Sequence, residues 1–175
     1  MRRLLLLRHA KSERLEPGGR DRDRVLAKRG RADAPKVGAY MVRHALKPDL
    51  AVVSPAARTR ETWELVAGAF DVAPAVNFEE RIYEAPPQAV LQVIKQTAPE
   101  VETLLVVGHN PGLQELAVTL IAAGDVEARQ RLKEDFPTSA LAVINFALTD
   151  WRRLHRHAGR LEHFVTPRLL EAATD

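Results

Sequence analysis

The sequence has no cysteine, few aromatic residues and no long hydrophobic run, and each absence excludes a class of protein. Without cysteine the chain has neither a disulfide framework nor thiolate chemistry. Aromatic residues make up 5% of the 175 residues, which leaves little material for stacking on nucleic-acid bases. The apolar run Leu4–Leu7 is far too short for a membrane span or for the core of a signal peptide. We therefore expect a cytoplasmic protein that binds neither membranes nor nucleic acid.

The charges and the length are those of one ordinary globular domain. The formal net charge is +3, but basic residues are interspersed with acidic ones, as in the stretch Arg20-Asp21-Arg22-Asp23-Arg24. This mixture indicates a solvated surface rather than a patch for a polyanion. A chain of 175 residues can bury a substantial core but is short for two domains, so we expect a single domain over residues 1–175.

Three apolar segments are each followed by cationic or imidazole side chains. Arg8 and His9 come directly after the first segment, Arg58 follows the second, and His109 follows the third. The three segments, predicted to be strands, are residues 4–7, 50–53 and 103–107. In open α/β sheets, ligands bind at the carboxyl ends of the strands. The pattern therefore predicts a site for an anionic ligand at that edge.

The segments between the strands are typical of helices. Apolar residues recur at three- and four-residue spacing, and we expect helices over residues 27–45, 55–70, 87–98 and 111–120. Ser54 is expected to cap the second helix, and Pro35 to start or kink the first. A late hairpin is expected from residues 141–146 and 159–165. This order predicts an α/β fold, a three-layer α/β/α sandwich with a mostly parallel central sheet.

Taken together, these motifs resemble the histidine phosphatase superfamily, which is also called phosphoglycerate-mutase-like. The short length and a Pro-Thr-Ser-Ala turn before a late strand resemble its SixA-type phosphohistidine phosphatase branch. The motifs are Arg8-His9-Ala10, Ser54-Pro55-x-x-Arg58-x-x-x-Thr62, Gly108-His109-Asn110 and Pro137-Thr138-Ser139-Ala140.

The resemblance implies phosphoryl transfer through a covalent phosphohistidine. His9 would attack phosphorus with a neutral ring nitrogen, while its other nitrogen donates its proton to a backbone carbonyl. Arg8, Arg58 and His109 would surround the phosphoryl oxygens, with His109 as the imidazolium. An arginine at a helix start suits phosphate because its planar fork can form two hydrogen bonds.

The resemblance also implies a general acid and residues that contact the substrate. The acid is expected to be Glu80, with Glu84 as the alternative, because the acidic segment 79–84, which follows a short edge strand expected over residues 76–78, is similar to the segment that carries the acid in the family. Lys11, Ser12 and Asn110 stand next to the motif histidines and are expected to bind substrate together with Glu84.

Neither a metal nor a cofactor is expected, because arginine and imidazolium supply the positive charge. The pair His155 and His157 lacks further ligands at metal-binding spacing. The expected partner is a protein carrying phosphohistidine. Two alternatives remain, a phosphatase of small sugar or nucleotide phosphate esters and a non-catalytic module that binds phosphorylated ligands.

Overall fold

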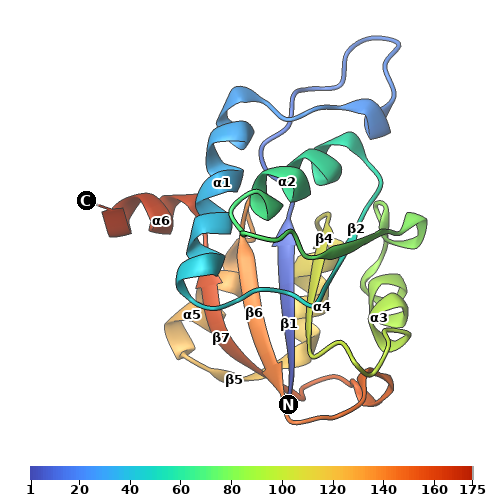
Figure 1. Cartoon of the computed structure of the whole chain (residues 1–175), viewed down its shortest axis with the longest axis vertical. Coiled ribbons are helices and arrows are strands. Elements are labelled where there is room, and N and C mark those ends of the chain that lie inside the picture. Colours follow the sequence, from blue (N-terminus) through green and yellow to red (C-terminus); the bar gives the residue numbers. More distant parts are fainter. Residues whose placement is uncertain (175) are drawn as a thin grey trace.

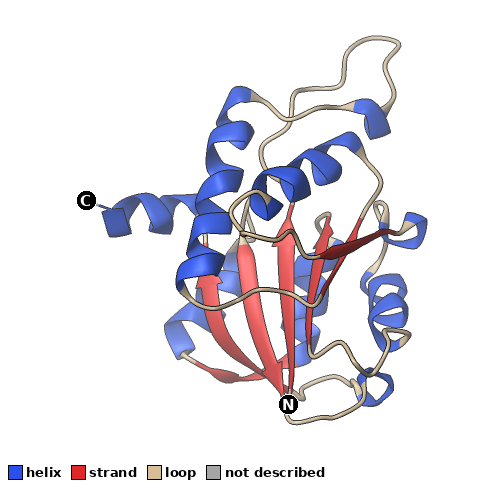
Figure 2. Ribbon diagram, in the orientation of Figure 1, coloured by secondary structure: helices blue, strands red, loops and turns tan. Residues whose placement is uncertain are grey.

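The computed structural model describes residues 1–174, with side chains through residue 172. Seven strands form one sheet in the order β3-β2-β4-β1-β6-β7-β5 (Figures 1 and 2). Their bounds are β1 (Arg2–Arg8), β2 (Leu50–Val53), β3 (Ala75–Phe78), β4 (Thr103–Gly108), β5 (Ile121–Gly124), β6 (Leu141–Phe146) and β7 (Gly159–Val165). The predicted strands are all present, and β5 is an addition that the sequence did not indicate.

The sheet is mostly parallel, as predicted. β1 pairs in parallel with β4, which pairs in parallel with β2, and β2 with β3. β6 runs antiparallel to both of its neighbours, β1 and β7, so β7 points in the same direction as β1. The carboxyl ends of β1, β2, β4 and β7 therefore meet at one edge of the sheet.

Helices cover both faces of the sheet and complete the three-layer sandwich (Figure 2). α1, α2 and α6 pack on one face, and α3, α4 and α5 pack on the other. Along β1, Leu4 and Leu6 join one core cluster while Leu5 and Leu7 join the other. This explains why an unbroken leucine run forms the strand, since both of its faces are buried. The helices are α1 (Lys28–Arg43), α2 (Ala57–Ala67), α3 (Pro87–Lys95), α4 (Gly112–Leu120), α5 (Val126–Glu134) and α6 (Pro167–Thr174).

Three short 3-10 helices, η1 (Asp21–Asp23), η2 (Glu80–Ile82) and η3 (Trp151–Arg153), lie in the connections. An isolated antiparallel bridge between Ser12 and Leu26 closes the base of the long loop that carries η1. No helix in the described part of the chain is both long and apolar enough to cross a membrane.

Two local predictions differ from the structure. α1 begins at Lys28, seven residues before Pro35, so the prediction that the proline starts this helix was wrong, and Pro35 lies in its interior. α2 begins at Ala57 after Ala56, and no side chain caps it, so the prediction that Ser54 is its cap was wrong. The Ser54 hydroxyl is instead directed at a histidine, as described below.

Candidate active site

Strand register brings the predicted residues together at the carboxyl edge of the sheet. Arg8 is paired with Gly108 across β1 and β4, and Val53 is paired with Val107 across β2 and β4. The residues that follow these pairs, including His9 and His109, leave the sheet at the same level. Their rings lie with centroids 5.5 Å apart.

His9 is held in one tautomer by its own loop. Its Nδ1 lies 2.8 Å from the carbonyl oxygen of Ala10, which can only accept, so Nδ1 carries the proton and Nε2 keeps its lone pair. The loop is fixed in turn, because Ala10 N donates to Thr62 Oγ1 and Thr62 Oγ1 donates to the Arg58 carbonyl. Burial, with smaller contributions from Arg58 and Arg8, lowers the pKa of His9 to about 4.

Arg58 is fully buried in the first turn of α2 and is surrounded by acceptors. Its Nη1 donates to the backbone oxygen of Asp21 at 2.9 Å. Its Nη2 lies 3.0 Å from Asp21 Oδ2, 2.6 Å from Glu84 Oε1 and 3.3 Å from His109 Nδ1. Its Nε is buried and has no partner within the described chain, so one donor of the guanidinium group is unused.

Arg8 has a similar unused donor. Its Nη1 donates to the Phe136 carbonyl at 3.0 Å, and its buried Nε has no partner among the described residues. The same carbonyl accepts from Asn110 Nδ2 at 3.1 Å. Burial lowers the pKa of Arg8 although nearby Asp135 and Glu84 oppose that shift. Asn110 therefore helps to fix the segment against which Arg8 rests.

The surroundings of His109 favour its neutral ring, whereas the sequence resemblance implied an imidazolium. Burial, and then the charges of His9 and Arg58, lower the pKa of His109 to about 3. Its Nε2 lies 2.7 Å from Ser54 Oγ, and its Nδ1 lies 3.2 Å from Glu84 Oε1. Ser54 thus orients this ring and does not cap α2.

The two candidate acids occupy different environments. Glu80 is solvent-exposed, and its carboxylate accepts from both terminal nitrogens of Arg22, at 3.0 and 2.8 Å. Glu84 instead contacts Arg58 and His109 directly. Gly112 allows its chain segment to approach, because a Cβ there would lie 2.3 Å from the Ala85 oxygen. The structure brings Glu84, but not the expected Glu80, to the histidine pair.

Lys11 and Ser12 lie near the cluster but do not contact its side chains. The Lys11 side chain is exposed and forms no hydrogen bond or ion pair among residues 1–172, while its backbone oxygen accepts from Ala27 N. Ser12 Oγ accepts from Arg24 Nη1 at 3.2 Å, which ties the two ends of the loop together.

Two residues that sequence reasoning did not select, Asp21 and Tyr83, complete the cluster. Asp21 Oδ2 accepts from Arg58 Nη2 and from the Tyr83 hydroxyl, and its Oδ1 accepts from Arg24 Nε at 3.0 Å. We call these four residues the Asp21 clasp. Burial alone would raise the pKa of Asp21, but the hydrogen bonds from Tyr83 and Arg58 outweigh burial and lower this pKa to about 2. The Tyr83 ring also meets His109 edge-on, with centroids 5.5 Å apart.

No signal in the sequence identified the clasp. Asp21 stands in an alternating run of arginine and aspartate that is typical of a solvated surface. No group of three or more metal-ligating side chains is present among the described residues.

Comparison with known proteins identifies the family. Residues 4–86 match the model of the histidine phosphatase superfamily, branch 1. An uncharacterized protein of Mycobacterium leprae is 36% identical over 168 residues, covering 93% of this chain and 100% of the relative. The crystal structure of a candidate phosphohistidine phosphatase, SixA, from Agrobacterium tumefaciens superposes with a TM-score of 0.81 at 31% identity, covering 95% of this chain and 98% of the other.

The chain belongs to the histidine phosphatase superfamily and is of the SixA type. It is therefore a phosphatase that acts on a phosphorylated substrate. A phosphoserine phosphatase of Entamoeba histolytica shares the fold with a TM-score of 0.62 at 16% identity, covering 97% of this chain and 100% of the other. The fold thus accommodates different phosphorylated substrates.

Proposed function

We propose that this protein hydrolyses phosphohistidine on a substrate protein through a covalent phosphohistidine on its own His9. The observation that carries the proposal is the fixed tautomer of His9. Its Nδ1 is bonded to the Ala10 carbonyl, and its pKa is lowered to about 4, so Nε2 has a free lone pair at neutral pH. A neutral imidazole held in this way is a competent nucleophile.

In the first step, His9 Nε2 forms a bond to phosphorus as the bond to the leaving group breaks. Arg8 and Arg58 would stabilise the phosphoryl oxygens, since each has a buried Nε–H without a partner within residues 1–172. His109 would contribute a third contact, and the phosphoryl dianion would raise its pKa from the low value of the free enzyme. Fixed donors of this kind supply most of the catalysis in such transfers.

In the second step, water attacks the phosphohistidine and frees His9. Glu84 is the carboxylate we assign to this step in place of Glu80, because it contacts both Arg58 and His109. It would accept the proton of the attacking water as the P–O bond forms and the P–N bond to His9 breaks. The histidine then regains its free Nε2, and inorganic phosphate leaves.

Phosphohistidine suits this site because its leaving group needs little help. A phosphorylated imidazole that is protonated on its other nitrogen departs as a neutral ring, without a proton from the enzyme. A leaving group of this kind needs no proton from Glu84, which contacts Arg58 and His109 and is placed to act on the attacking water in the second step. The similarity to the candidate phosphohistidine phosphatase of Agrobacterium tumefaciens supports the same substrate.

A small-molecule phosphomonoesterase is the second candidate. The observation that favours it is again Glu84, since a carboxyl group beside the arginine and histidine is where an ester-cleaving enzyme needs its proton donor. In that case the enzyme would turn over free sugar or nucleotide phosphates.

The test measures phosphate release from a phosphohistidine-bearing carrier protein and from a panel of small phosphomonoesters. His9→Ala should abolish release, and His155→Ala, which alters an exposed histidine in the turn before β7 at the opposite edge of the sheet, should leave it unchanged. Denaturing the enzyme during turnover of 32P-labelled carrier should trap an acid-labile label in the unmodified protein only. Release from esters alone would select the second candidate.

A further inference from the structure

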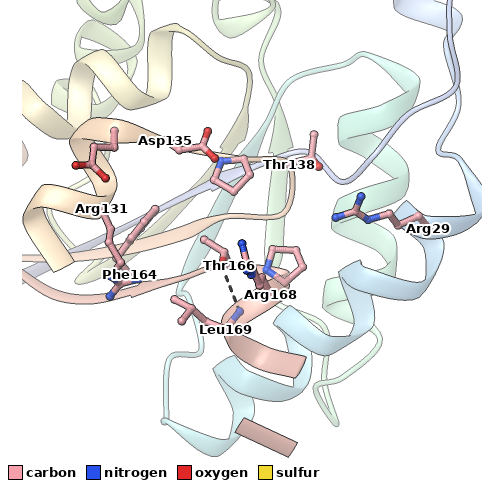
Figure 3. Close-up of a pocket in the computed structure, with 11 residues that line it drawn as sticks. Arg29, Arg131, Asp135, Thr138, Phe164, Thr166, Arg168 and Leu169 are labelled. Carbon is pink, nitrogen blue, oxygen red and sulfur yellow. Dashed lines mark hydrogen bonds between the residues drawn. The ribbon is translucent and has the colours of Figure 1, made fainter. Parts of the chain in front are cut away.

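A second concavity lies beside the candidate active site, at the same edge of the sheet. It encloses about 380 Å³ between α5, the start of α6 and the segment that precedes β6 (Figure 3). Its walls include Arg131, Thr138, Phe164, Thr166 and Arg168. We call it the β7 pocket, because Phe164 belongs to β7 and Thr166 follows that strand directly.

Topology fixes the distance between the β7 pocket and His9. β7 is two strands away from β1 in the sheet and points in the same direction. Neighbouring strands are about 4.8 Å apart, so the carboxyl ends of β1 and β7 are separated by roughly 10 Å. A polypeptide whose phosphohistidine meets His9 can reach that far with a few residues. A phosphate ester no larger than a sugar phosphate is too short to fill both places.

One segment forms a wall of both the pocket and the active site. Residues 137 and 138 line the pocket. The carbonyl of Phe136, immediately before them, accepts from Arg8, and the amide of Ser139, immediately after them, donates to the carbonyls of Arg8 and His9. A ligand in the pocket therefore lies against the same chain that supports the candidate nucleophile.

The pocket combines an apolar wall with cations that form no ion pair. Leu169 is 38% exposed, whereas Phe164 is 4% exposed and the guanidinium of Arg131 lies 5.6 Å from the centroid of its ring. Within residues 1–172, Arg131 and Arg168 form no ion pair and no hydrogen bond through their side chains, and both are exposed. The pocket's carboxylates, Glu134 and Asp135, lie on the stretch that leads toward Phe136, whereas Arg168 follows β7 (Figure 3). Apolar and acidic side chains together match this lining.

We propose that the β7 pocket docks the polypeptide that flanks the phosphohistidine of the substrate protein, with an apolar side chain against Leu169 and an acidic one between Arg131 and Arg168. The proposal rests on the proposed function, because it assigns a place to the protein part of that substrate. Surface arginines of this kind act mainly on encounter and affinity and do not take part in the chemistry.

The test compares a phosphohistidine-bearing protein with free phosphohistidine as substrates. The variant Arg131→Glu/Arg168→Glu reverses two exposed charges and should raise KM for the protein substrate roughly tenfold, with kcat unchanged, in line with the effects of charge reversal at an interface. Its kcat/KM for free phosphohistidine should stay within about twofold of the unmodified enzyme, because Arg8, Arg58 and the histidines are intact. Arg156→Glu, an exposed arginine in the turn before β7 at the opposite edge, is the matched control.

The outcomes separate the two proposals. An unchanged KM for the protein substrate in the double variant would overturn the docking site alone, provided that the unmodified enzyme cleaves that substrate. Equal losses on both substrates would also overturn it, because they would show that the arginines act on the reaction or on the fold. If the unmodified enzyme releases no phosphate from the carrier protein, the proposed function fails and the docking site fails with it.

Discussion

Replacing Asp21 with asparagine should destabilise the protein in a way that depends on pH. The carboxylate joins the loop that carries η1 to Arg58, Arg24 and Tyr83. Its pKa falls from 3.8 to about 2 on folding. A difference of this size between the unfolded and folded pKa values corresponds to at most ~2.4 kcal/mol. The side chain is 38% exposed. Screening by water should therefore reduce the effect to about 1 kcal/mol.

The sign of the pH dependence follows from the direction of the shift. A carboxyl group whose pKa is lowered on folding contributes its full stabilisation above its unfolded pKa and loses it as the pH falls through the folded value. The difference in unfolding free energy between the unmodified protein and Asp21→Asn should therefore be constant from pH 7 to about 5 and shrink by roughly half by pH 3.

Urea unfolding followed by circular dichroism at pH 7, 5, 4 and 3 measures this difference. Asp23→Asn is the control, since its side chain is 72% exposed and its ion pair with Arg20 spans 3.9 Å. A difference that does not change with pH, or an asparagine variant as stable as the unmodified protein, would refute the role assigned to the Asp21 carboxylate.

Three further predictions concern catalysis. Arg58→Lys should lower kcat roughly 100-fold, because a point charge cannot replace the planar fork, and steady-state phosphate release measures it; a rate within a few-fold of normal would contradict the proposed pocket. Glu84→Gln should lower turnover of phosphohistidine by about 100-fold, because water attacks the same phosphoenzyme with either substrate, and that of an alkyl phosphate by at least as much, while Glu80→Gln changes both by less than about twofold. A loss of less than a few-fold with Glu84→Gln on phosphohistidine would count against its role in the second step. The kcat/KM profile should fall only below about pH 4, where His9 becomes protonated in the free enzyme, and a midpoint near 6.5 would show that its pKa is not lowered.

The sequence predicted the parts of the fold that follow from local pattern. The unbroken leucine run was predicted to be a short buried strand, and in the structure Leu4 and Leu5 indeed enter opposite core clusters. β5 was missed because its four residues carry little pattern of their own and pair with β7, a partner distant in sequence. The prediction for Ser54 failed because a serine before a proline suggests a helix cap. In the structure its hydroxyl instead lies within hydrogen-bond distance of His109, which is 55 residues away in the sequence.

The same distinction applies to the site. Residues at strand ends could be placed from the sequence, because register in a parallel sheet brings them to one edge. Residues on loops could not be placed from the sequence, since their position depends on the backbone conformation of the loop, which no periodic pattern determines. Glu84 has a φ of +47°, in the left-handed region that few non-glycine residues adopt. The acidic segment contains no glycine that would predict this backbone conformation. Asp21 reaches Arg58 across 37 residues of sequence.

The electrostatics of the cluster link anion binding to nucleophilicity. Burying Arg58 without partners would cost several kcal/mol, and the carboxylates of Asp21 and Glu84 offset that cost. These carboxylates leave one buried donor of Arg58, its Nε, without a partner among the described residues. They also do not keep the His9 ring protonated at neutral pH, because burial and the arginine charges lower its pKa to about 4. In the proposed mechanism, the arginine that holds the phosphoryl group is thus also a reason why the nucleophile has a lone pair. A substitution that removes the Arg58 charge should therefore weaken phosphate binding and raise the pKa of His9 together, and a change in only one of these properties would show that they are independent.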